Sequence, residues 1–497
     1  MSTSLMRLLE GIAPVPVNQA QVADLTLDSR EVRAGSVFLA LPGRTAHGLK
    51  FAAEAAARGA SAILWEAGAD IAPPVLPPSV FGAAVPELGK RAGRIADRFF
   101  DRPSSQMRIT GITGTNGKTT SAYLLAQCLD RLGSAAAYIG TIGWGRINEL
   151  QPPTLTTPDV ITLHRRLAQL RAGGVRDVAL EVSSQALDQE RTAEVLFHTA
   201  AFTNLSRDHL DYHGTMASYG AAKIRLFHAP NLQHIVINVG DAFGREFAQR
   251  YAGGAPLTAV WIGSGDCGRL AERFLHATHV TLDLSGISME LEGTFGKAGV
   301  ATKLLGRFNA ENALIVIGCL LSLGVALDAA VRALAECGAP PGRMEVIEPK
   351  VPGKAMAVID YAHTPDALSK ALAALREHCA GSLWCVFGCG GDRDAGKRPL
   401  MGAAADAIAD QIIVTDDNPR SESPQSITGG IVSGIKSRAP RVIHDRGEAI
   451  AAALGEAQPT DVVLIAGKGH EEYQIYGETR RSFSDRLEAQ RYLGVAA

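Results

Sequence analysis

The stretch at residues 108–120, RITGITGTNGKTT, contains residue types suited to holding a nucleoside triphosphate. A short apolar run leads into a glycine-bearing turn that ends in Gly117, Lys118 and Thr119, and a helix-like run follows. The N–H groups of such a turn and of the next helix N-terminus carry partial positive charge, and Lys118 adds a full charge beside the outer phosphates. Thr119 offers a hydroxyl to a phosphate-bound Mg2+. The general pattern has glycine where this chain has Ile112, so the loop is a variant that predicts nucleotide binding and no particular reaction.

Further clusters of reactive side chains follow apolar runs elsewhere in the chain. They are Glu181–Ser184, Asn204–His209, Asp360–His363, Gly388–Asp394, Asp416–Arg420 and Gly467–Glu471. Turn formation accounts for their Asp, Asn, Gly and Pro residues, but not for so many Arg, His and Glu. Ligands of open α/β sheets bind beyond the carboxyl ends of the strands. The clusters therefore predict two sites, one in each of two large domains, that face each other.

The elements that position these clusters are predicted from alternating apolar and helix-like segments. Apolar runs predict strands at 107–112, 135–139, 178–182, 199–203, 235–238, 355–359, 383–387, 412–415 and 462–466. Shorter runs at 36–41 and 61–65, with an alanine-rich helix between them, predict a small α/β module before the nucleotide loop. Repeated β-then-α order favours mainly parallel sheets covered on both faces, an α/β fold. The apolar run 313–327 is too short to span a bilayer and predicts a buried helix.

The composition changes to Pro-, Ser- and Gly-rich residues near 102–105 and 338–342, which predicts linkers there. They divide the 497 residues into three domains at 1–104, 105–338 and 339–497, a number that also fits the chain length. The central domain is expected to be a P-loop ATPase-type parallel sheet, and the last a Rossmann-like domain.

Composition excludes several classes of partner. The chain has 46% hydrophobic and 20% charged residues and a net charge of -2, so there is no basic excess for nucleic acid or an anionic membrane. Its seven cysteines form no paired CxxC array for zinc, which favours reduced thiols in the cytoplasm. The first 15 residues lack the apolar core of a secretory signal, so we expect neither export nor membrane insertion.

The chain resembles the bacterial Mur ligases over essentially its whole length. The resemblance rests on Leu27–Arg30, Gly114–Thr120, Thr156–Pro158, Glu181–Ser184, Asn204–Gly214, Lys223, Gly306–Asn309, Asn312, Pro341–Arg343, Asp360–Pro365, Gly391–Arg393, Asp417–Arg420 and Gly467–Glu471. One departure is Gln185, where histidine after the paired serines is more familiar.

The resemblance implies an ATP-dependent amide ligase in peptidoglycan precursor synthesis, of the branch that extends UDP-MurNAc-L-Ala-D-Glu. There the γ-carboxylate of D-glutamate attacks the γ-phosphate of ATP, and an amine then attacks the acyl phosphate, which leaves ADP and phosphate. Cations are required because two anions must approach each other. The family also implies a UDP-binding N-terminal domain. We expect a monomer whose partners are small-molecule substrates.

Roles at the nucleotide end follow from the same resemblance. It assigns Gly114, Thr115, Asn116, Gly117, Lys118, Thr119 and Thr120 to the phosphates, Asn312 to the adenine, and Arg343 and Asp360 to the ribose. The residues it assigns to catalysis are Lys118, Glu181, His209 and Lys223. The residues it assigns to Mg2+ binding are Thr119, Glu181, His209 and Lys223. The family carbamylates the matching lysine, so Lys223 is expected as N6-carboxylysine.

The other two substrates are assigned in the same way. Leu27 and Ser29 would contact the uridine end, and Thr156, Thr157, Ser183, Gln189 and Arg191 the sugar-peptide end. The amino acid would meet Arg393, Asp417, Asn418, Pro419, Arg420, Gly467 and Glu471. Arg420 offers a planar fork that suits the second carboxylate of meso-diaminopimelate and repels the lone ammonium of lysine.

Two alternative functions, and the role of one histidine, remain open. A lysine-adding or folyl-glutamate-type ligase uses the same scaffold, although Leu27–Arg30 disfavours a pterin substrate. A nucleotide-dependent switch or scaffold without chemistry would bind ATP and form no amide, and Lys118, Glu181, His209 and Lys223 argue against it. His363 is either a positioning group or a turn residue.

Overall fold

The structure is a computed structural model that describes residues 3–15, 21–43, 46–68, 72–263 and 270–495. The chain forms two compact units. The first contains Met1–Lys118, Leu129–Ile237 and Asp241–Thr258, and the second contains Thr119–Cys128, Asn238–Gly240 and Ala259–Ala497. The domain boundaries at 104/105 and 338/339 remain our proposal.

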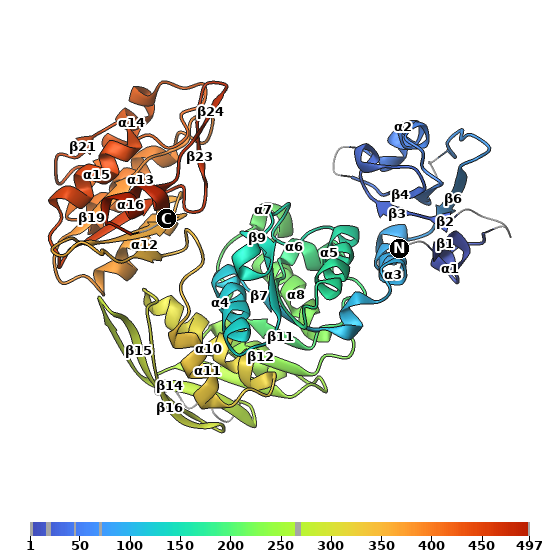
Figure 1. The fold of residues 1–497 in the computed structure, drawn as a ribbon, viewed down its shortest axis with the longest axis horizontal. Helices are drawn as coiled ribbons and strands as arrows, with labels where there is room; N and C mark the ends of the chain where they lie inside the picture. The colour runs from blue at the N-terminus through green and yellow to red at the C-terminus, as the bar shows by residue number, and fades with distance from the viewer. Residues whose placement is uncertain (1–2, 16–20, 44–45, 69–71, 264–269, 496–497) are drawn as a thin grey trace. The chain divides into compact units, whose positions relative to one another are not determined.

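The N-terminal part of the first unit is the expected small α/β module (Figure 1). Its sheet consists of the parallel strands β3 (Asp24–Thr26), β4 (Ser36–Ala40), β5 (Ala62–Glu66) and β6 (Phe81–Val85). Side chains of β4 alternate between the two faces of the sheet. Val37 and Leu39 pack in one core with α1 (Leu5–Leu9) and α3 (Leu88–Phe99), and Phe38 packs in a second core with α2 (Ala52–Ala57). Short strands β1 (Thr3–Ser4) and β2 (Gln21–Val22) pair antiparallel beside it.

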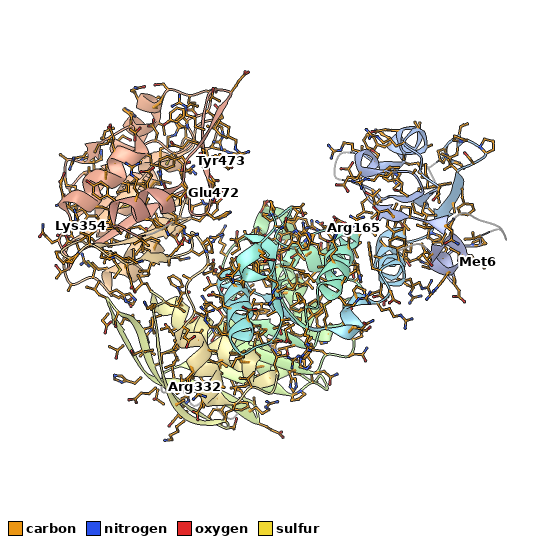
Figure 2. All side chains as sticks on the ribbon, viewed as in Figure 1. Met6, Arg165, Arg332, Lys354, Glu472 and Tyr473 are labelled. Atoms are coloured by element: carbon orange, nitrogen blue, oxygen red, sulfur yellow. The ribbon has the colours of Figure 1, made fainter. Side chains whose placement is uncertain are left out.

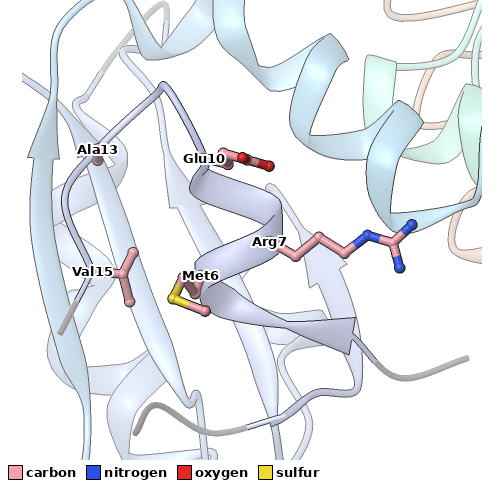
Figure 3. Close-up of a pocket in the computed structure, with 5 residues that line it drawn as sticks. All are labelled: Met6, Arg7, Glu10, Ala13 and Val15. Atoms are coloured by element: carbon pink, nitrogen blue, oxygen red, sulfur yellow. The ribbon is translucent and has the colours of Figure 1, made fainter. Parts of the chain in front are cut away.

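A pocket of about 310 Å³ opens beside α1 in this module. Its lining residues are Met6, Arg7, Glu10, Ala13 and Val15. Figure 3 shows Met6 and Val15 close together, with Arg7 extending to the other side of the helix. None of the residues predicted to bind substrate lines this pocket.

Helix α5 (Val160–Ala172) connects the N-terminal module to the parallel sheet of the same unit. Asp159 starts the helix by accepting hydrogen bonds from the N–H groups of Ile161 and Thr162, each at 3.0 Å. Arg165, labelled in Figure 2, donates to Asp24 at 2.9 Å. His164 is fully buried, and its Nδ1 lies 3.8 Å from Oδ1 of Asp97 on α3. Residues of both helices share one apolar core.

Asp97 makes this contact dependent on pH. Burial, followed by the charge of Glu194, raises the pKa of Asp97 from 3.8 to about 6, while burial lowers the pKa of His164 to about 4. Burial disfavours the charged carboxylate in the folded protein. The contribution of protonated Asp97 to the free energy of unfolding is therefore present at low pH and is lost as the pH rises through about 6.

We expect Asp97→Asn to stabilise the protein above pH 7. Its advantage in free energy of unfolding over the parent should be about 1 kcal/mol larger at pH 7.5 than at pH 5, a value discounted for the partial exposure of the site. Denaturant unfolding of both proteins at the two pH values measures this difference. Equal shifts at both pH values would show that Asp97 does not titrate in this range.

The first unit also contains a parallel sheet that carries most of the predicted nucleotide chemistry. Its strands lie in the order β12 (His234–Asn238), β11 (Thr199–Phe202), β7 (Arg108–Thr113), β10 (Asp177–Glu181), β8 (Ala136–Gly140) and β9 (Gly143–Gly145). The first five strands pair parallel along this order, and β9 pairs antiparallel with β8. The carboxyl ends of β7, β10, β8 and β11 therefore meet at one edge, as the sequence predicted. Helices α6 (Ser184–Asp188), α7 (Leu210–His213), α8 (Met216–Ile224) and α9 (Ala242–Arg250) belong to this part.

The expected linker near 102–105 is an ordered turn. Residues Pro103–Gln106 form a 3-10 helix, in which Pro103 and Ser104 are buried. The hydroxyl of Ser104 accepts a hydrogen bond from the N–H of Leu196 at 3.1 Å. This segment is thus packed rather than loose.

The second unit contains antiparallel strands that the sequence analysis did not predict. Strands β14 (Arg273–Asp283), β15 (Gly286–Gly293) and β16 (Gly296–Thr302) form a meander, and β13 (Leu257–Ile262) has residues in both units. The helix expected at 313–327 has different bounds: α10 spans Arg307–Ser322, and α11 spans Leu327–Ala335. Gly324, with φ +86°, lies between them and breaks the helix.

The C-terminal part of the second unit is a covered sheet in the order β17 (Glu345–Ile347), β18 (Met356–Asp360), β22 (Val462–Ala466), β19 (Leu383–Phe387), β20 (Gln411–Val414) and β21 (Arg441–Val442). Only the β17–β18 pair is antiparallel. Alternating strand residues pack on α12 (Pro365–Arg376), α13 (Lys397–Ile408) and α14 (Pro424–Val432) on one face, and on α15 (Arg446–Glu456) and α16 (Asp485–Tyr492) on the other. A separate hairpin consists of β23 (Tyr473–Tyr476) and β24 (Thr479–Ser482).

Within the described ranges, no helix is long and apolar enough to cross a membrane. Six cysteines of these ranges are buried and form no disulfide, and Cys267 lies outside them.

Candidate active site

The glycine-bearing loop connects β7 to α4 (Lys118–Arg131). Gly114 has φ +150°, and a Cβ atom at this position would lie 1.8 Å from Oγ1 of Thr203. Only glycine fits there, which explains the first part of the motif. Ile112, which replaces the usual glycine, lies inside β7 and is fully buried, so the variant position serves the core of the sheet.

The segment after β11 holds the loop in shape. The N–H of Thr115 donates to the carbonyl oxygen of Asn204 at 2.8 Å, and the N–H of Asn116 donates to its Oδ1 at 3.0 Å. The N–H of Ser206 in turn donates to Oγ1 of Thr115 at 3.0 Å. Asn204 and Ser206 therefore support the phosphate loop, as does Thr203, whose hydroxyl donates to the carbonyl oxygen of Asn116 at 2.6 Å. The sequence alone did not indicate this role for Thr203 and Ser206.

Two lysines converge on the loop. Nζ of Lys118 donates to the carbonyl oxygens of Gly114 and Thr115, each at 2.8 Å, and Nζ of Lys223 donates to Gly114 at 2.7 Å. Lys223 is 1% exposed and lies on α8. Burial, followed by the charge of Lys118, lowers the pKa of Lys223 to about 6. A neutral amine at Lys223 lets the two side chains share one carbonyl oxygen.

Tyr219 connects these groups and was also missed. Its hydroxyl donates to Oγ1 of Thr115 at 3.2 Å, and its ring centre lies 4.4 Å from Nζ of Lys223 and 5.9 Å from the ring of His209. Burial raises the pKa of Tyr219 to about 12. His209 precedes α7 as its N-cap residue, with φ +52°. Its Nε2 lies 3.6 Å from the carboxylate of Asp208.

Glu181 ends β10 as a fully buried carboxylate. It accepts hydrogen bonds from the hydroxyl of Tyr138, from the N–H of Thr141 at 2.9 Å and from Oγ1 of Thr141 at 3.2 Å. The hydroxyls of Thr141 and Thr156 lie 3.1 Å apart. The structure thus brings Thr156 beside the predicted metal ligand Glu181.

The donor set fits a magnesium–nucleotide pair only in part. Among the described residues, no three His, Cys, Asp or Glu side chains converge as a ready-made metal cage. Mg2+ is normally held by one or two carboxylates together with substrate phosphates and water, so Glu181 and the hydroxyl of Thr119 are suitable donors. The unmodified amine of Lys223 is not an oxygen donor, and a carbamate on it would be.

The predicted sugar-peptide residues form one network in the first unit. Oγ1 of Thr157 donates to the carbonyl oxygen of Glu181 at 2.8 Å and accepts from the N–H of Ser183 at 3.0 Å. Nη1 of Arg191 donates to the carbonyl oxygen of Thr157 at 3.1 Å, and its Nε donates to Oε1 of Gln189 at 3.0 Å. Ser183 also starts α6 as its N-cap. The network positions these side chains together while it uses several of their polar atoms.

The predicted uridine residues lie in the N-terminal module. Ser29 is 6% exposed, and its hydroxyl donates to Glu54 at 3.1 Å. Leu27 packs against the apolar core of α1 and α3. The Leu27–Arg30 motif thus has clear local structural roles, including the 2.6 Å ion pair between Asp28 and Arg30.

Residues predicted for the adenosine end occupy two places in the second unit. Asn312 is 3% exposed on α10, where its Nδ2 donates to Asn309 at 2.8 Å and its Oδ1 accepts from Ser121 at 3.4 Å. Asp360 ends β18 and accepts from the N–H groups of Met344 at 2.8 Å and Ala362 at 2.9 Å.

Arg343 and Asp360 are electrostatic partners. Burial raises the pKa of Asp360, and the charge of Arg343 opposes this rise. The Arg343 guanidinium lies 5.0 Å from the ring centre of Tyr361. Nδ1 of His363 lies 2.8 Å from the carbonyl oxygen of Tyr361, a contact that belongs to the turn alternative for this histidine.

The residues predicted to recognise the amino acid gather at the carboxyl ends of β19, β20 and β22. Arg420 has φ +55°, and its Nη1 donates to the carbonyl oxygen of Gly391 at 2.7 Å. A Cβ atom on Gly390 would lie 2.9 Å from Nη1 of Arg420 and 3.8 Å from Cγ of Arg393, so the two arginines flank this glycine. Gly391 packs directly against the carbonyl of Pro419, where a Cβ atom would lie 1.8 Å from the oxygen.

An acidic group completes this set. Nδ2 of Asn418 donates to Oε2 of Glu471 at 3.1 Å, and Gly467 lies beside the carboxylate of Asp417. The side chain of Lys468 is fully buried among them, a residue that the sequence analysis did not assign although it lies in the Gly467–Glu471 motif. Cationic and acidic groups thus lie on one loop cluster, which suits a ligand with a carboxylate and an ammonium at one end.

Strand β23 fixes the conformation of the 416–420 loop. Nε2 of Gln474 donates to the carbonyl oxygens of Asp416 at 3.2 Å and Asp417 at 3.1 Å. The N–H of Ile475 donates to Oδ1 of Asn418 at 3.0 Å, and the N–H of Arg420 donates to the carbonyl oxygen of Ile475 at 3.0 Å. Glu472 and Tyr473, labelled in Figure 2, lie at the start of this hairpin. The hairpin was missed by the sequence analysis.

We expect Gln474→Leu to weaken binding of the amino acid. It leaves the buried carbonyl oxygen of Asp417 without this donor, whereas that of Asp416 keeps a hydrogen bond from Arg446 at 3.5 Å. The KM for the amino acid should therefore rise about tenfold while the KM for ATP stays nearly constant. Steady-state kinetics with Gln458→Leu, an exposed glutamine of the same domain, gives the control. An unchanged KM for the amino acid would mean that the loop keeps its shape without Gln474.

Comparison with known proteins identifies the family. Residues 21–99 match the "Mur ligase family, catalytic domain", residues 112–320 the "Mur ligase middle domain", and residues 342–469 the "Mur ligase, glutamate ligase domain". The chain belongs to the Mur ligase family. Its three-domain α/β architecture, with a central parallel-sheet domain, agrees with the fold predicted from the sequence.

Individual relatives support the same placement of this Mur ligase. It is 47% identical to the UDP-N-acetylmuramoyl-L-alanyl-D-glutamate–2,6-diaminopimelate ligase of Alkalilimnicola ehrlichii, over 95% of each chain. The enzyme of that name from Pseudomonas aeruginosa is 44% identical over 98% of each chain. A solved structure of a ligase of that name is 34% identical, covers 99% of each chain and has a TM-score of 0.74. A MurF structure from Acinetobacter baumannii, 17% identical with a TM-score of 0.64, shares the fold.

Proposed function

We propose that this Mur ligase joins meso-diaminopimelate to the D-glutamate γ-carboxylate of UDP-MurNAc-L-Ala-D-Glu, with ATP as co-substrate. Full-length relatives at 44–47% identity bear the name of that ligase, which supports the reaction. The observation that carries the choice of amino acid is the cluster in which Arg393 and Arg420 flank Gly390, with Asp417 and Glu471 on the adjoining turns. Two guanidinium groups suit the distal carboxylate, and the acidic pair suits the distal ammonium.

The proposed chemistry has two steps. A γ-carboxylate oxygen attacks the γ-phosphorus of ATP, ADP leaves, and an acyl phosphate forms. The neutral amine of diaminopimelate then attacks the acyl carbon, phosphate leaves with the C–O bond electrons, and the nitrogen loses a proton. Lys118 would turn from the carbonyl oxygens of its own loop to the phosphates and offset their charge. Bound Mg2+ would neutralise charge on the phosphate oxygens, held by Thr119, Glu181, His209 and carbamylated Lys223.

The remaining assignments are part of the same proposal. Gly114, Thr115, Asn116, Gly117 and Thr120 would cradle the phosphates, Asn312, Arg343 and Asp360 the nucleoside, and Leu27 and Ser29 the uridine. Thr156, Thr157, Ser183, Gln189 and Arg191 would bind the sugar-peptide, and Asn418, Pro419 and Gly467 would shape the amino-acid site. We place the enzyme in the cytoplasm as a monomer.

The burial of Lys223 supports the proposed carbamylation. A carbamate forms when an uncharged amine attacks CO2 and releases a proton, and burial beside Lys118 favours the uncharged form. We expect the protein in 13C-labelled bicarbonate to show a carbamate carbon resonance by NMR, and Lys223→Met to lack it. A carbamate resonance of equal intensity in the variant would assign the modification to another amine.

Dependence on all substrates tests the reaction itself. We expect phosphate release from ATP to require both UDP-MurNAc-L-Ala-D-Glu and diaminopimelate, with one phosphate for each amide formed. Release at the same rate without the amine would contradict a ligase, and ATP binding with no amide would favour the scaffold alternative.

A further inference from the structure

Lys468 lies at the centre of the acidic part of the amino-acid site. It follows β22, and its side chain is 0% exposed. Its Nζ lies 3.2 Å from Oε2 of Glu471, 3.5 Å from Oδ1 of Asn418 and 3.9 Å from Oδ1 of Asp417. The ring centre of Tyr473, labelled in Figure 2, is 5.5 Å away. The ammonium thus contacts three of the residues that we assign to the substrate.

A fully buried ammonium requires compensation, because burial removes the charge from the water that would stabilise it. Asp417 and Glu471 supply two negative charges for one positive charge. The acidic group therefore carries a net charge of about -1 with Lys468 and about -2 without it. In the parent protein, a substrate ammonium therefore meets a net charge of about -1 instead of about -2.

Lys468 also orients Glu471. Both Nζ of Lys468 and Nδ2 of Asn418 reach the same carboxylate oxygen, Oε2. Among the described residues, no hydrogen bond to Oε1 is present, and the side chain of Glu471 is 21% exposed. Two donors on Oε2 fix this carboxylate and leave Oε1 as the oxygen available to a ligand.

We propose that Lys468 is a positioning residue that sets selectivity between amino acids with and without a distal carboxylate. It holds Oε1 of Glu471 toward the distal ammonium, and its charge keeps the acidic group from attracting a ligand that ends in an ammonium alone. Diaminopimelate brings a carboxylate with its ammonium, which Arg393 and Arg420 compensate, whereas lysine brings only the cation. This inference rests on the proposed function, since it concerns the same site.

Both effects of Lys468 act in the same direction on selectivity. Its removal misplaces Glu471 for diaminopimelate and makes the acidic group more attractive for lysine. A residue needed only for folding would lower the amount of active enzyme and leave the ratio of activities on the two amino acids unchanged.

The test compares kcat/KM for meso-diaminopimelate and L-lysine in the parent protein, in Lys468→Met and in Lys370→Met, which removes an exposed lysine. We expect the diaminopimelate-to-lysine ratio to fall at least about tenfold in Lys468→Met and to stay at the parent value in Lys370→Met. Lys468→Gln, which keeps a donor toward Glu471 and removes the charge, should also lower the ratio and serves if the methionine variant does not fold.

Two outcomes separate this inference from the proposed function. Unchanged ratios in folded Lys468→Met and Lys468→Gln, with the parent active on diaminopimelate, would overturn the role of Lys468 alone. A parent protein that forms no amide with diaminopimelate would overturn the proposed function first.

Discussion

We expect replacement of Lys118 by methionine to lower kcat for amide formation about 1,000-fold, because the variant would lack the cation that we propose offsets charge on the transferring phosphoryl group. Methionine keeps an unbranched side chain up to the ε carbon and removes the ammonium, together with its hydrogen bonds to Gly114 and Thr115. Single-turnover measurement of ADP formation with saturating ATP and UDP-MurNAc-L-Ala-D-Glu isolates the phosphoryl step.

The control for this prediction is the shape of the loop. Gly114 keeps the hydrogen bond that it accepts from Lys223, and Thr115 keeps its hydrogen bonds with Asn204 and Ser206. The melting temperature of the variant should therefore stay close to that of the parent. A variant with near-parent kcat would show that charge compensation in this site does not depend on Lys118.

We expect Arg420→Ala to lower kcat/KM for meso-diaminopimelate about 100-fold. This factor corresponds to the loss of a bidentate, charge-assisted interaction of about 3 kcal/mol. The activity on lysine should not fall, because lysine has no distal carboxylate to lose. The diaminopimelate-to-lysine ratio therefore drops by the same factor, and Arg420→Lys, which keeps the charge without the planar fork, recovers only part of it.

Arg441→Ala provides the matched control. Arg441 is an exposed arginine of β21 in the C-terminal sheet, where it pairs with Glu456. If Arg420→Ala lowered activity on both amino acids equally, Arg420 would hold the loop through Gly391 instead of reading the substrate.

Much of the parallel architecture was predictable because its signal is local. Runs of buried apolar residues such as Leu383–Phe387 and Val462–Ala466 have the predicted bounds, and others differ by one residue. The antiparallel strands β14–β16 were missed, since their alternating exposed and buried residues form no continuous apolar run.

The candidate site divides in the same way. Motifs that follow strands were located correctly at carboxyl ends of the sheets, because strand direction alone decides that placement. Lys468 and Gln474 were missed, since their burial depends on Asp417 and Glu471 or on Asp416, and most of these partners lie about 50 residues away in the chain. A buried lysine has no sequence signature apart from its partners.

The measurement that tests the central claim most directly is the mass of the product. The purified protein is incubated with ATP, Mg2+ and UDP-MurNAc-L-Ala-D-Glu, with meso-diaminopimelate in one reaction and L-lysine in a parallel one. We expect a UDP-MurNAc-tripeptide with diaminopimelate, one phosphate released per product, and little or no product with lysine. Product with lysine and none with diaminopimelate would keep the ligase and contradict the proposed role of Arg420, and no product with either would contradict the proposed function.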